Sequence, residues 1–182
     1  MKAPNTALEV ASHLIRLAQH ADAQEPVFLT NLHVQKLLFY AQAWSLAERS
    51  TPLFGDKIEA WAQGPAVYAV WKQFESFGKR PIDPDAVPPS SLSQADQAFL
   101  RTVWEAYKMY NAPTLRDMTH EEPAWRHARK DLAPDDRSTR ELLLDELGQT
   151  FRHKLDFARQ RLQSRRAEVE KRARANMLKR PA

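Results

Sequence analysis

The run from Leu29 to Pro65 constrains the fold of this chain more than any other segment. It opens with an apolar helix pattern, continues through a turn that contains Pro52 and Phe54, and ends at Gly64-Pro65 after a Glu-Ala-Trp segment. The run is strongly patterned, yet it holds no recognisable catalytic arrangement of side chains. It therefore favours a shaped helical domain that binds a partner over an enzyme.

Apolar residues that recur every three or four positions predict a mainly α fold. The expected helices cover residues 7–21, 31–48, 65–77 and 93–110, two short turns from 114 and 119, and a long helix from the Ser138-x-x-Glu141 capping box onward. Pro65 is expected at the first position of its helix, with Trp71 in the core and Lys57–Trp61 as a short strand. The fold class is thus a compact helical domain with a minor short β element and a long basic C-terminal helix.

Charge divides the chain into two unequal parts. Residues 150–182 hold 11 Lys and Arg against 3 Asp and Glu, whereas residues 1–149 hold 16 against 20. We therefore expect a mildly acidic domain at residues 1–149 and a basic helical extension at residues 150–182.

The basic extension has three readings: a solvated helix, a segment that binds nucleic acid, or a segment that binds an acidic protein. Glu168 and Glu170 each precede an arginine by four residues, which stabilises a solvated helix. No aromatic residue lies between Arg159 and Arg180, so a stacking platform for single strands is not expected. The nucleic-acid reading, which includes operator DNA as the partner, assigns phosphate contacts to Arg165, Arg166, Lys171, Arg172 and Arg174.

Composition limits the cellular compartment and the kinds of binding site that we expect for this protein. The chain has no cysteine and only four glycines, which excludes disulfides, thiolate metal sites and glycine-rich phosphate loops. Its first twenty residues show no continuous apolar stretch or cleavage signal, and no run approaches the length that spans a bilayer. We expect a cytoplasmic protein without a membrane partner.

Catalytic and metal-binding motifs are also missing. His120 and His127 flank Trp125, but the spacing is not H-E-x-x-H, and Pro123 interrupts the helix that such a motif needs. No serine occupies a G-x-S-x-G turn, and nothing in the spacing pairs Glu59 with another carboxylate. We expect no catalytic residue, metal or cofactor, and no enzymatic activity.

A candidate partner-binding corner lies at the end of the opening run. Large aromatic residues near turns on a rigid scaffold often anchor protein partners. Trp61 sits where the chain turns, and Tyr68 follows one helical turn into the next element. The residues assigned to partner binding are Glu59, Trp61, Gln63 and Tyr68.

Two groups of motifs follow one another along the chain. The first is Leu32-x-x-Gln35-Lys36-Leu37-Leu38-x-Tyr40-Ala41-Gln42-x-Trp44, then Pro52-Leu53-Phe54, then Ile58-Glu59-Ala60-Trp61-x-x-Gly64-Pro65-x-Val67. The second is Leu115-x-x-Met118-Thr119-His120-x-Glu122-x-x-Trp125-x-x-Ala128-Arg129, and Val70, Phe74, Phe77-Gly78 and Pro81-Ile82 lie between the two. In this order the motifs resemble the Panacea-domain family of SocA-like antitoxins and phage-associated GepA-like proteins. The resemblance spans residues 29–130, and the basic helix after Arg129 departs from it.

The resemblance implies an antitoxin of a bacterial, phage-associated toxin–antitoxin system. Such domains are typically encoded beside unrelated small toxins, which they neutralise by direct binding, and some present the toxin to a cytoplasmic AAA+ protease. The family brings no catalytic residues. The alternative function is a DNA-binding regulator that acts through the basic C-terminal helix. The identity of the toxin, the stoichiometry and the oligomeric state stay open.

Overall fold

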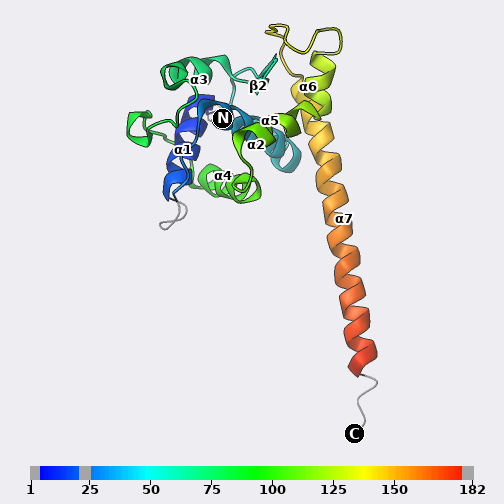
Figure 1. The fold of residues 1–182 in the computed structure, drawn as a ribbon. Helices are drawn as coiled ribbons and strands as arrows, with labels where there is room; N and C mark the ends of the chain where they lie inside the picture. Colours follow the sequence, from blue (N-terminus) through cyan, green and yellow to red (C-terminus); the bar gives the residue numbers. More distant parts are fainter. Residues whose placement is uncertain (1–4, 21–25, 178–182) are drawn as a thin grey trace.

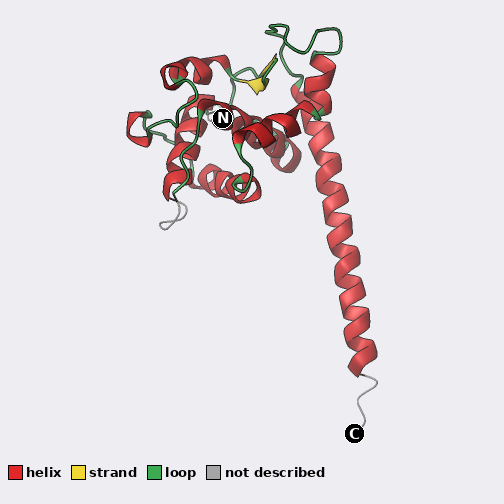
Figure 2. Ribbon diagram, viewed as in Figure 1, coloured by secondary structure: helices red, strands yellow, loops and turns green. Residues whose placement is uncertain are grey.

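The computed structural model describes residues 5–20 and 26–177 and is mainly α-helical (Figures 1 and 2). The α-helices within these residues are α1 (Ala7–His20), α2 (Asn31–Arg49), α3 (Tyr68–Gln73), α4 (Gln94–Tyr107), α5 (Ala112–His120), α6 (Pro123–Ala128) and α7 (Leu144–Met177). Two strands, β1 (Glu59–Trp61) and β2 (Gly64–Ala66), and two 3₁₀ turns, η1 (Glu75–Phe77) and η2 (Pro84–Ala86), complete the described chain. The predicted fold class is confirmed.

Helix α2 forms the centre of the body, with α1, α4, α5 and α7 packed around it. Nearly every residue from Asn31 to Ala47 is buried, as expected for a helix that is apolar on more than one side. Its few polar side chains therefore lie inside the protein, where each needs a hydrogen-bond partner. Gln42 meets this need by accepting from the amides of Leu53 and Phe54 at 2.9 and 3.2 Å, which fixes the turn after α2.

Capping signals in the sequence mark two of the helix starts correctly. At α1, the Glu9 amide donates to Thr6 Oγ1 at 3.2 Å, and the Thr6 amide donates to the Glu9 carboxylate at 2.9 Å. At α4, the Asp96 amide donates to Ser93 Oγ at 3.1 Å. These bonds satisfy amides that have no partner inside the helix.

The start of α3 differs from the sequence prediction. Pro65 was expected to open this helix, but it lies in β2, which pairs antiparallel with β1, and α3 begins at Tyr68. Proline lacks an amide donor, and both an edge strand and the first turn of a helix tolerate this loss. The proline alone therefore does not distinguish a strand from a helix start. The expected strand at Lys57–Trp61 is correct in part, since β1 covers its last three residues.

The prediction that a helix starts at the Ser138-x-x-Glu141 capping box is also wrong. Residues 140–142 extend beside β1 instead, because the Ala60 amide donates to the Arg140 carbonyl and the Leu142 amide to the Ile58 carbonyl, both at 2.8 Å. Helix α7 then begins at Leu144. Strand β1 is thus held on both edges, by β2 and by this segment.

Helix α7 packs on the body with its first turns and then projects away from it (Figure 1). Phe151 is buried against Phe39, Tyr40 and Trp44, and Lys154 forms an ion pair with the nearly buried Glu122 at 2.6 Å. From residue 156 to residue 172 every side chain is exposed. The predicted boundary between residues 149 and 150 falls inside this helix, and the division into two parts stays a prediction.

Gly148 marks the close approach of α7 to α2. A Cβ atom at this position would lie 3.2 Å from Leu46 Cβ, tighter than an ordinary contact. The glycine lowers helix propensity but brings the two helices together. Among the described residues, no helix is both long and apolar enough to cross a membrane.

Candidate partner-binding site

Two side chains of α2 hold the β1–β2 hairpin against the body. Gln35 Oε1 accepts from the Val67 amide at 2.7 Å, and Lys36 Nζ donates to the Pro65 carbonyl at 2.8 Å. Gln35 is itself fixed by a bond from its Nε2 to Asn31 Oδ1 at 3.1 Å. The adjacent Gln-Lys pair of α2 therefore positions β2 rather than facing solvent.

Gly64 lets the hairpin lie directly on these groups. Its φ of +90° falls in the region that glycine tolerates and residues with a Cβ avoid. A Cβ atom here would also come within 2.6 Å of Lys36 Nζ and 2.7 Å of Thr119 Oγ1. Both conformation and space thus require glycine at this point.

Helix α6 and its C-terminal end hold the other strand. Trp125 Nε1 donates to the Trp61 carbonyl at 3.0 Å, and Arg129 Nη1 donates to the Ala60 carbonyl at 2.9 Å. Arg129 is buried, and its Nη2 donates to three further carbonyls, those of Ala133, Pro134 and Asp136. The hairpin is thus clamped by side chains of α2 together with side chains of α6 and its C-terminal end.

The clamp predicts a local effect for Trp125→Phe. This change leaves the Trp61 carbonyl without its side-chain donor, which we expect to cost about 1–2 kcal/mol of unfolding free energy. Amide hydrogen exchange at Ala60, in the middle of β1, should speed up relative to wild type, whereas amides of α1 such as that of Leu14 should change less. Unchanged exchange at Ala60 would show that the indole bond does not hold the hairpin.

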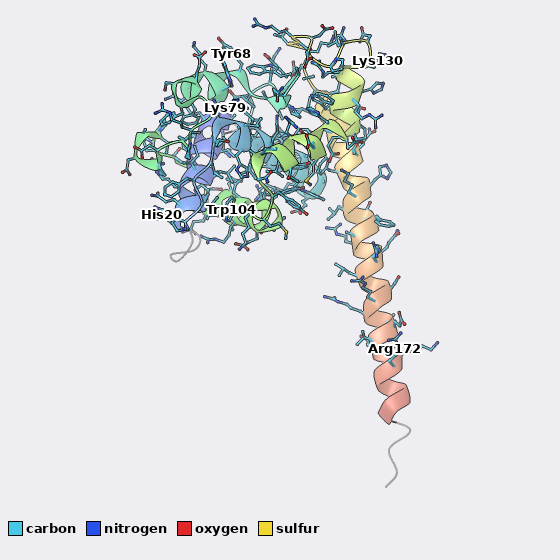
Figure 3. The ribbon with its side chains drawn as sticks, in the orientation of Figure 1. His20, Tyr68, Lys79, Trp104, Lys130 and Arg172 are labelled. Atoms are coloured by element: carbon cyan, nitrogen blue, oxygen red, sulfur yellow. The ribbon has the colours of Figure 1, made fainter. Side chains whose placement is uncertain are left out.

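An aromatic group covers the outer side of the hairpin corner. The ring centroid of Trp61 lies 5.4 Å from Trp71 and 6.4 Å from Tyr68. Trp61 Nε1 donates to Glu59 Oε2 at 2.7 Å, which fixes the orientation of the indole. Tyr68 is 54% exposed and stands at the edge of the body (Figure 3).

All four residues assigned to partner binding line one surface hollow of about 640 Å³. The hollow is walled by β1, α3 and the loop before α7, and its lining comprises Glu59, Trp61, Ala62, Gln63, Tyr68, Trp71, Arg137, Ser138 and Thr139. The structure brings the four residues together, while their role in binding stays a prediction. We call this hollow the outer hollow.

The sequence reasoning placed Trp71 wrongly and missed the 137–139 segment. Trp71 was expected in the core from its position four residues after Val67, but it is half-buried between the two other aromatic rings. Because α3 begins at Tyr68, Val67 is not part of the helix and its spacing to Trp71 carries no information about a shared face. The 137–139 segment carries no pattern that would bring it to β1.

A second hollow, of about 520 Å³, lies next to the outer hollow. The two hollows share three lining residues, Trp61, Gln63 and Trp71. Lys36 is part of its lining and is only 1% exposed. Burial lowers the pKa of Lys36 from 10.5 to about 7, and the nearby Arg116 guanidinium acts in the same direction. We call this second hollow the inner hollow.

The second predicted site, on the basic helix, lies apart from the hairpin corner. Arg165, Arg166, Lys171 and Arg172 are exposed on the projecting part of α7. Arg172 lies far from Tyr68 (Figure 3). The Arg172 guanidinium pairs with Glu168 at 2.5 Å. Arg174 also belongs to α7, but its side chain lies outside the described side chains.

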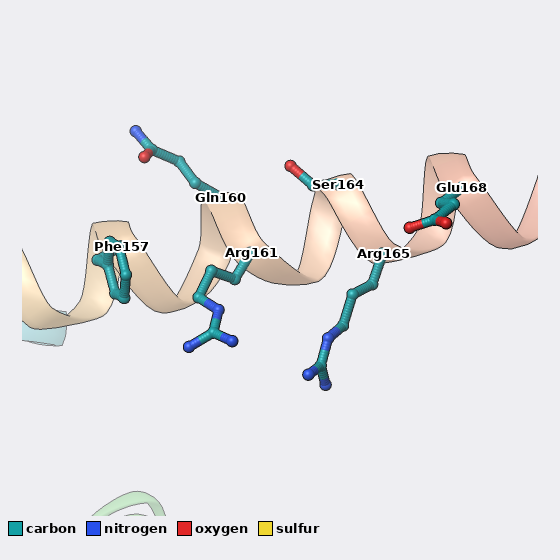
Figure 4. A pocket seen from close by; sticks show the side chains of 6 residues that line it. All are labelled: Phe157, Gln160, Arg161, Ser164, Arg165 and Glu168. Carbon is teal, nitrogen blue, oxygen red and sulfur yellow. The ribbon is translucent and has the colours of Figure 1, made fainter.

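One flank of this helix groups basic and aromatic side chains. Phe157, Arg161 and Arg165 extend to the same side of α7 (Figure 4), and the Arg161 guanidinium lies 5.8 Å from the Phe157 ring centroid. All six residues that line the shallow hollow here belong to α7 itself. The structure does not join this flank to the hairpin corner.

The histidines have structural contacts. His120 stacks on Trp125 with ring centroids 4.1 Å apart, and His127 Nδ1 lies 2.9 Å from Glu146 Oε1. Burial, with Lys36 and Arg116 adding to it, lowers the pKa of His120 below 6.5. Within residues 5–20 and 26–177, no three His, Asp or Glu side chains gather in a way that could hold a metal ion.

Comparison with known families agrees with the motifs that build the corner. The family model for the Antitoxin SocA-like, Panacea domain matches residues 34–126, which is just over half of the 182 residues. The chain belongs to this family. The Panacea match runs from α2 through most of α6 and includes the whole hairpin. Neither a curated protein nor a solved structure matches the chain.

The Panacea motifs acquire a physical meaning from these contacts. The Gln35-Lys36 pair fastens β2, Trp125 fastens β1, and Arg129, just beyond the match, ties β1 to the following loop. These four residues therefore hold the corner in place.

Proposed function

We propose that this protein is an antitoxin that neutralises a cognate protein toxin by direct binding through the hairpin corner. Membership of the SocA-like Panacea family supports the antitoxin role. The observation that carries the choice of surface is the aromatic cluster of exposed Tyr68 and half-buried Trp61 and Trp71 on a clamped hairpin. The proposal includes no catalytic step.

A clamped aromatic corner suits protein recognition for energetic reasons. Trp and Tyr bury large areas with few rotatable bonds, so they lose little entropy on binding. The hydrogen bonds that hold β1 and β2 keep the rings in place before a partner arrives. The outer hollow beside them offers a concave surface of a size that a partner side chain or short segment can enter.

The direct test is Tyr68→Ala in an assay of toxin binding and growth rescue. The toxin is supplied as the product of the adjacent gene, co-expressed with the antitoxin. Because Tyr68 is 54% exposed and makes no hydrogen bond among the described contacts, the stability should change by less than about 0.5 kcal/mol. Toxin affinity should fall by about 2 kcal/mol, or roughly thirtyfold in Kd, and rescue should be weakened.

Phe28→Ala provides the matched control, since Phe28 is 49% exposed and lines neither hollow. It should bind and rescue like wild type. If both variants bind the toxin equally well, the partner surface lies elsewhere. If wild-type protein never relieves the toxicity of the neighbouring gene product, the antitoxin role itself fails.

A second candidate function is DNA binding through α7, which the row of exposed basic residues favours. Contacts to phosphates release counterions, so the affinity should fall steeply with salt. A mobility shift of operator DNA should be lost when Arg165, Arg166 and Lys171 are changed to Ser. A shift that survives these changes would remove α7 from the role. Presentation of the toxin to an AAA+ protease is a further proposal that rests on the family alone.

A further inference from the structure

Lys36 is a buried lysine without a carboxylate partner. Its Nζ has one hydrogen bond among the described residues, to the Pro65 carbonyl, although an ammonium group has three donors. The charged group that acts on it is also positive, the Arg116 guanidinium on α5. A buried ammonium in such surroundings is poorly stabilised unless an anion joins it.

The inner hollow leads to this lysine. It is lined by residues of the first two turns of α2, Asn31, Leu32, Gln35 and Lys36, and by Trp61 and Trp71. Gly64 belongs to the same lining, and because it has no side chain, Lys36 Nζ can lie closer to it than a Cβ atom would allow. The indole rings form apolar walls, and the lysine forms the buried polar end.

The wider charge around the inner hollow also favours an anion. His120 on α5 and Lys79 after η1 add positive or neutral groups, and the N-terminal end of α2 carries a partial positive charge. Glu75 is the acidic residue of the lining, and it is already paired with Lys72 at 2.5 Å.

We propose that the inner hollow is a carboxylate-binding pocket, in which an acidic group of the bound partner pairs with Lys36. The ligand is a carboxylate on a short apolar stem: the stem packs against the Trp61 and Trp71 rings, and the carboxylate accepts from Lys36 Nζ. A single ammonium and two indole walls suit one negative charge better than a phosphate dianion. This inference rests on the proposed function for its biological partner, but the pocket can be tested without a toxin.

The test follows the lysine side chains of the full-length protein by NMR, with Lys36 assigned by the loss of its signal in Lys36→Met. Two probes separate the sources of the carboxylate: N-acetyl-glutamate α-amide for an acidic side chain, and N-acetyl-alanine for a chain terminus. Either probe at saturation should raise the titration midpoint of Lys36 by about one pH unit or more, because a paired anion favours the charged form. The uncharged N-acetyl-glutamine amide should leave it unchanged.

Lys130→Met serves as the control variant, since Lys130 is exposed and lines neither hollow. It should bind the probes like wild type. If Lys36→Met does not fold, assignment by backbone-to-side-chain correlation in the wild-type protein replaces it. No change at Lys36 with either carboxylate, or a change with inorganic phosphate alone, overturns the proposal.

The two proposals fail in different ways. A toxin that binds wild-type protein while both carboxylates leave Lys36 unchanged contradicts the pocket and leaves the antitoxin role intact. Probes that move Lys36 in a protein that binds no toxin contradict the antitoxin role and leave the pocket intact.

Discussion

Replacing Phe151 with alanine should lower the unfolding free energy of this protein by about 3–5 kcal/mol, as expected for a large aromatic residue removed from a core. Phe151 is 1% exposed, and its ring centroid lies 5.0 Å from Trp44 in an edge-to-face arrangement. It also contacts Phe39 and Tyr40 on the same face of α2. Urea unfolding followed by far-UV circular dichroism provides the measurement.

Phe157 offers a matched control, six residues further along the same helix. Its side chain is 62% exposed, and the Arg161 guanidinium of the same helix lies 5.8 Å from its ring centroid, so Phe157→Ala should change the stability by less than about 0.5 kcal/mol. Equal effects of the two substitutions would mean that α7 does not pack on α2 in solution as it does here.

The contacts of Phe151 bear on where the folded unit ends. A chain cut after residue 149 would lose Phe151 and also Lys154, the partner of the nearly buried Glu122. An unpaired buried carboxylate is strongly destabilising. Helix α7 stops packing on the body near Leu155. A shortened protein should therefore end after this residue and not after residue 149.

Periodicity predicted the long helices well because their stripes face one continuous core. Val34, Leu37 and Leu38 are fully buried in α2, and Phe99 and Val103 face inward from α4, as their spacing indicated. The hairpin could not be predicted in the same way. Pro65 fits the start of a helix and a short edge strand equally well, and the partner of β1 on its other edge comes from residues 140–142, far along the chain.

The candidate site was predicted in part. Glu59, Trp61, Gln63 and Tyr68 do lie around one hollow, because the turn after Trp61 brings the start of α3 back over β1. Arg137 also lines the outer hollow, but it is far from Trp61 in the sequence. No local sequence pattern predicts such a long-range contact, so Arg137 was not predicted as part of the site.

Lys36 was missed because a lysine is ordinarily expected at the surface. The signal was present in α2, where apolar residues occupy more than one side, so that a charged residue among them had to be buried. The adjacent Gln35 is buried for the same reason and serves the hairpin in the same way. When two polar residues lie in a helix that is apolar on all sides, they are expected to form hydrogen bonds with the backbone of another segment, as Gln35 and Lys36 do here.

The buried lysine should make the stability of the wild-type protein depend on pH above neutrality. The pKa of Lys36 is about 7 in the folded protein and 10.5 in an unfolded chain. Between these values the unfolded state binds the additional proton, so the unfolding free energy should increase with pH by up to about 1.4 kcal/mol per unit. Below pH 7 both states carry the proton, and this contribution to the slope disappears.

Lys36→Met isolates the effect, because methionine keeps much of the volume and removes the charge. Urea unfolding of both proteins from pH 7 to just below pH 10, the ordinary pKa of tyrosine, should show the wild type gaining stability relative to the variant. The neighbouring His120 does not mimic this change, because its pKa is lowered from 6.5, out of the range of the measurement. Parallel curves for the two proteins would mean that Lys36 keeps an ordinary pKa, and that the ammonium is better solvated than its burial indicates.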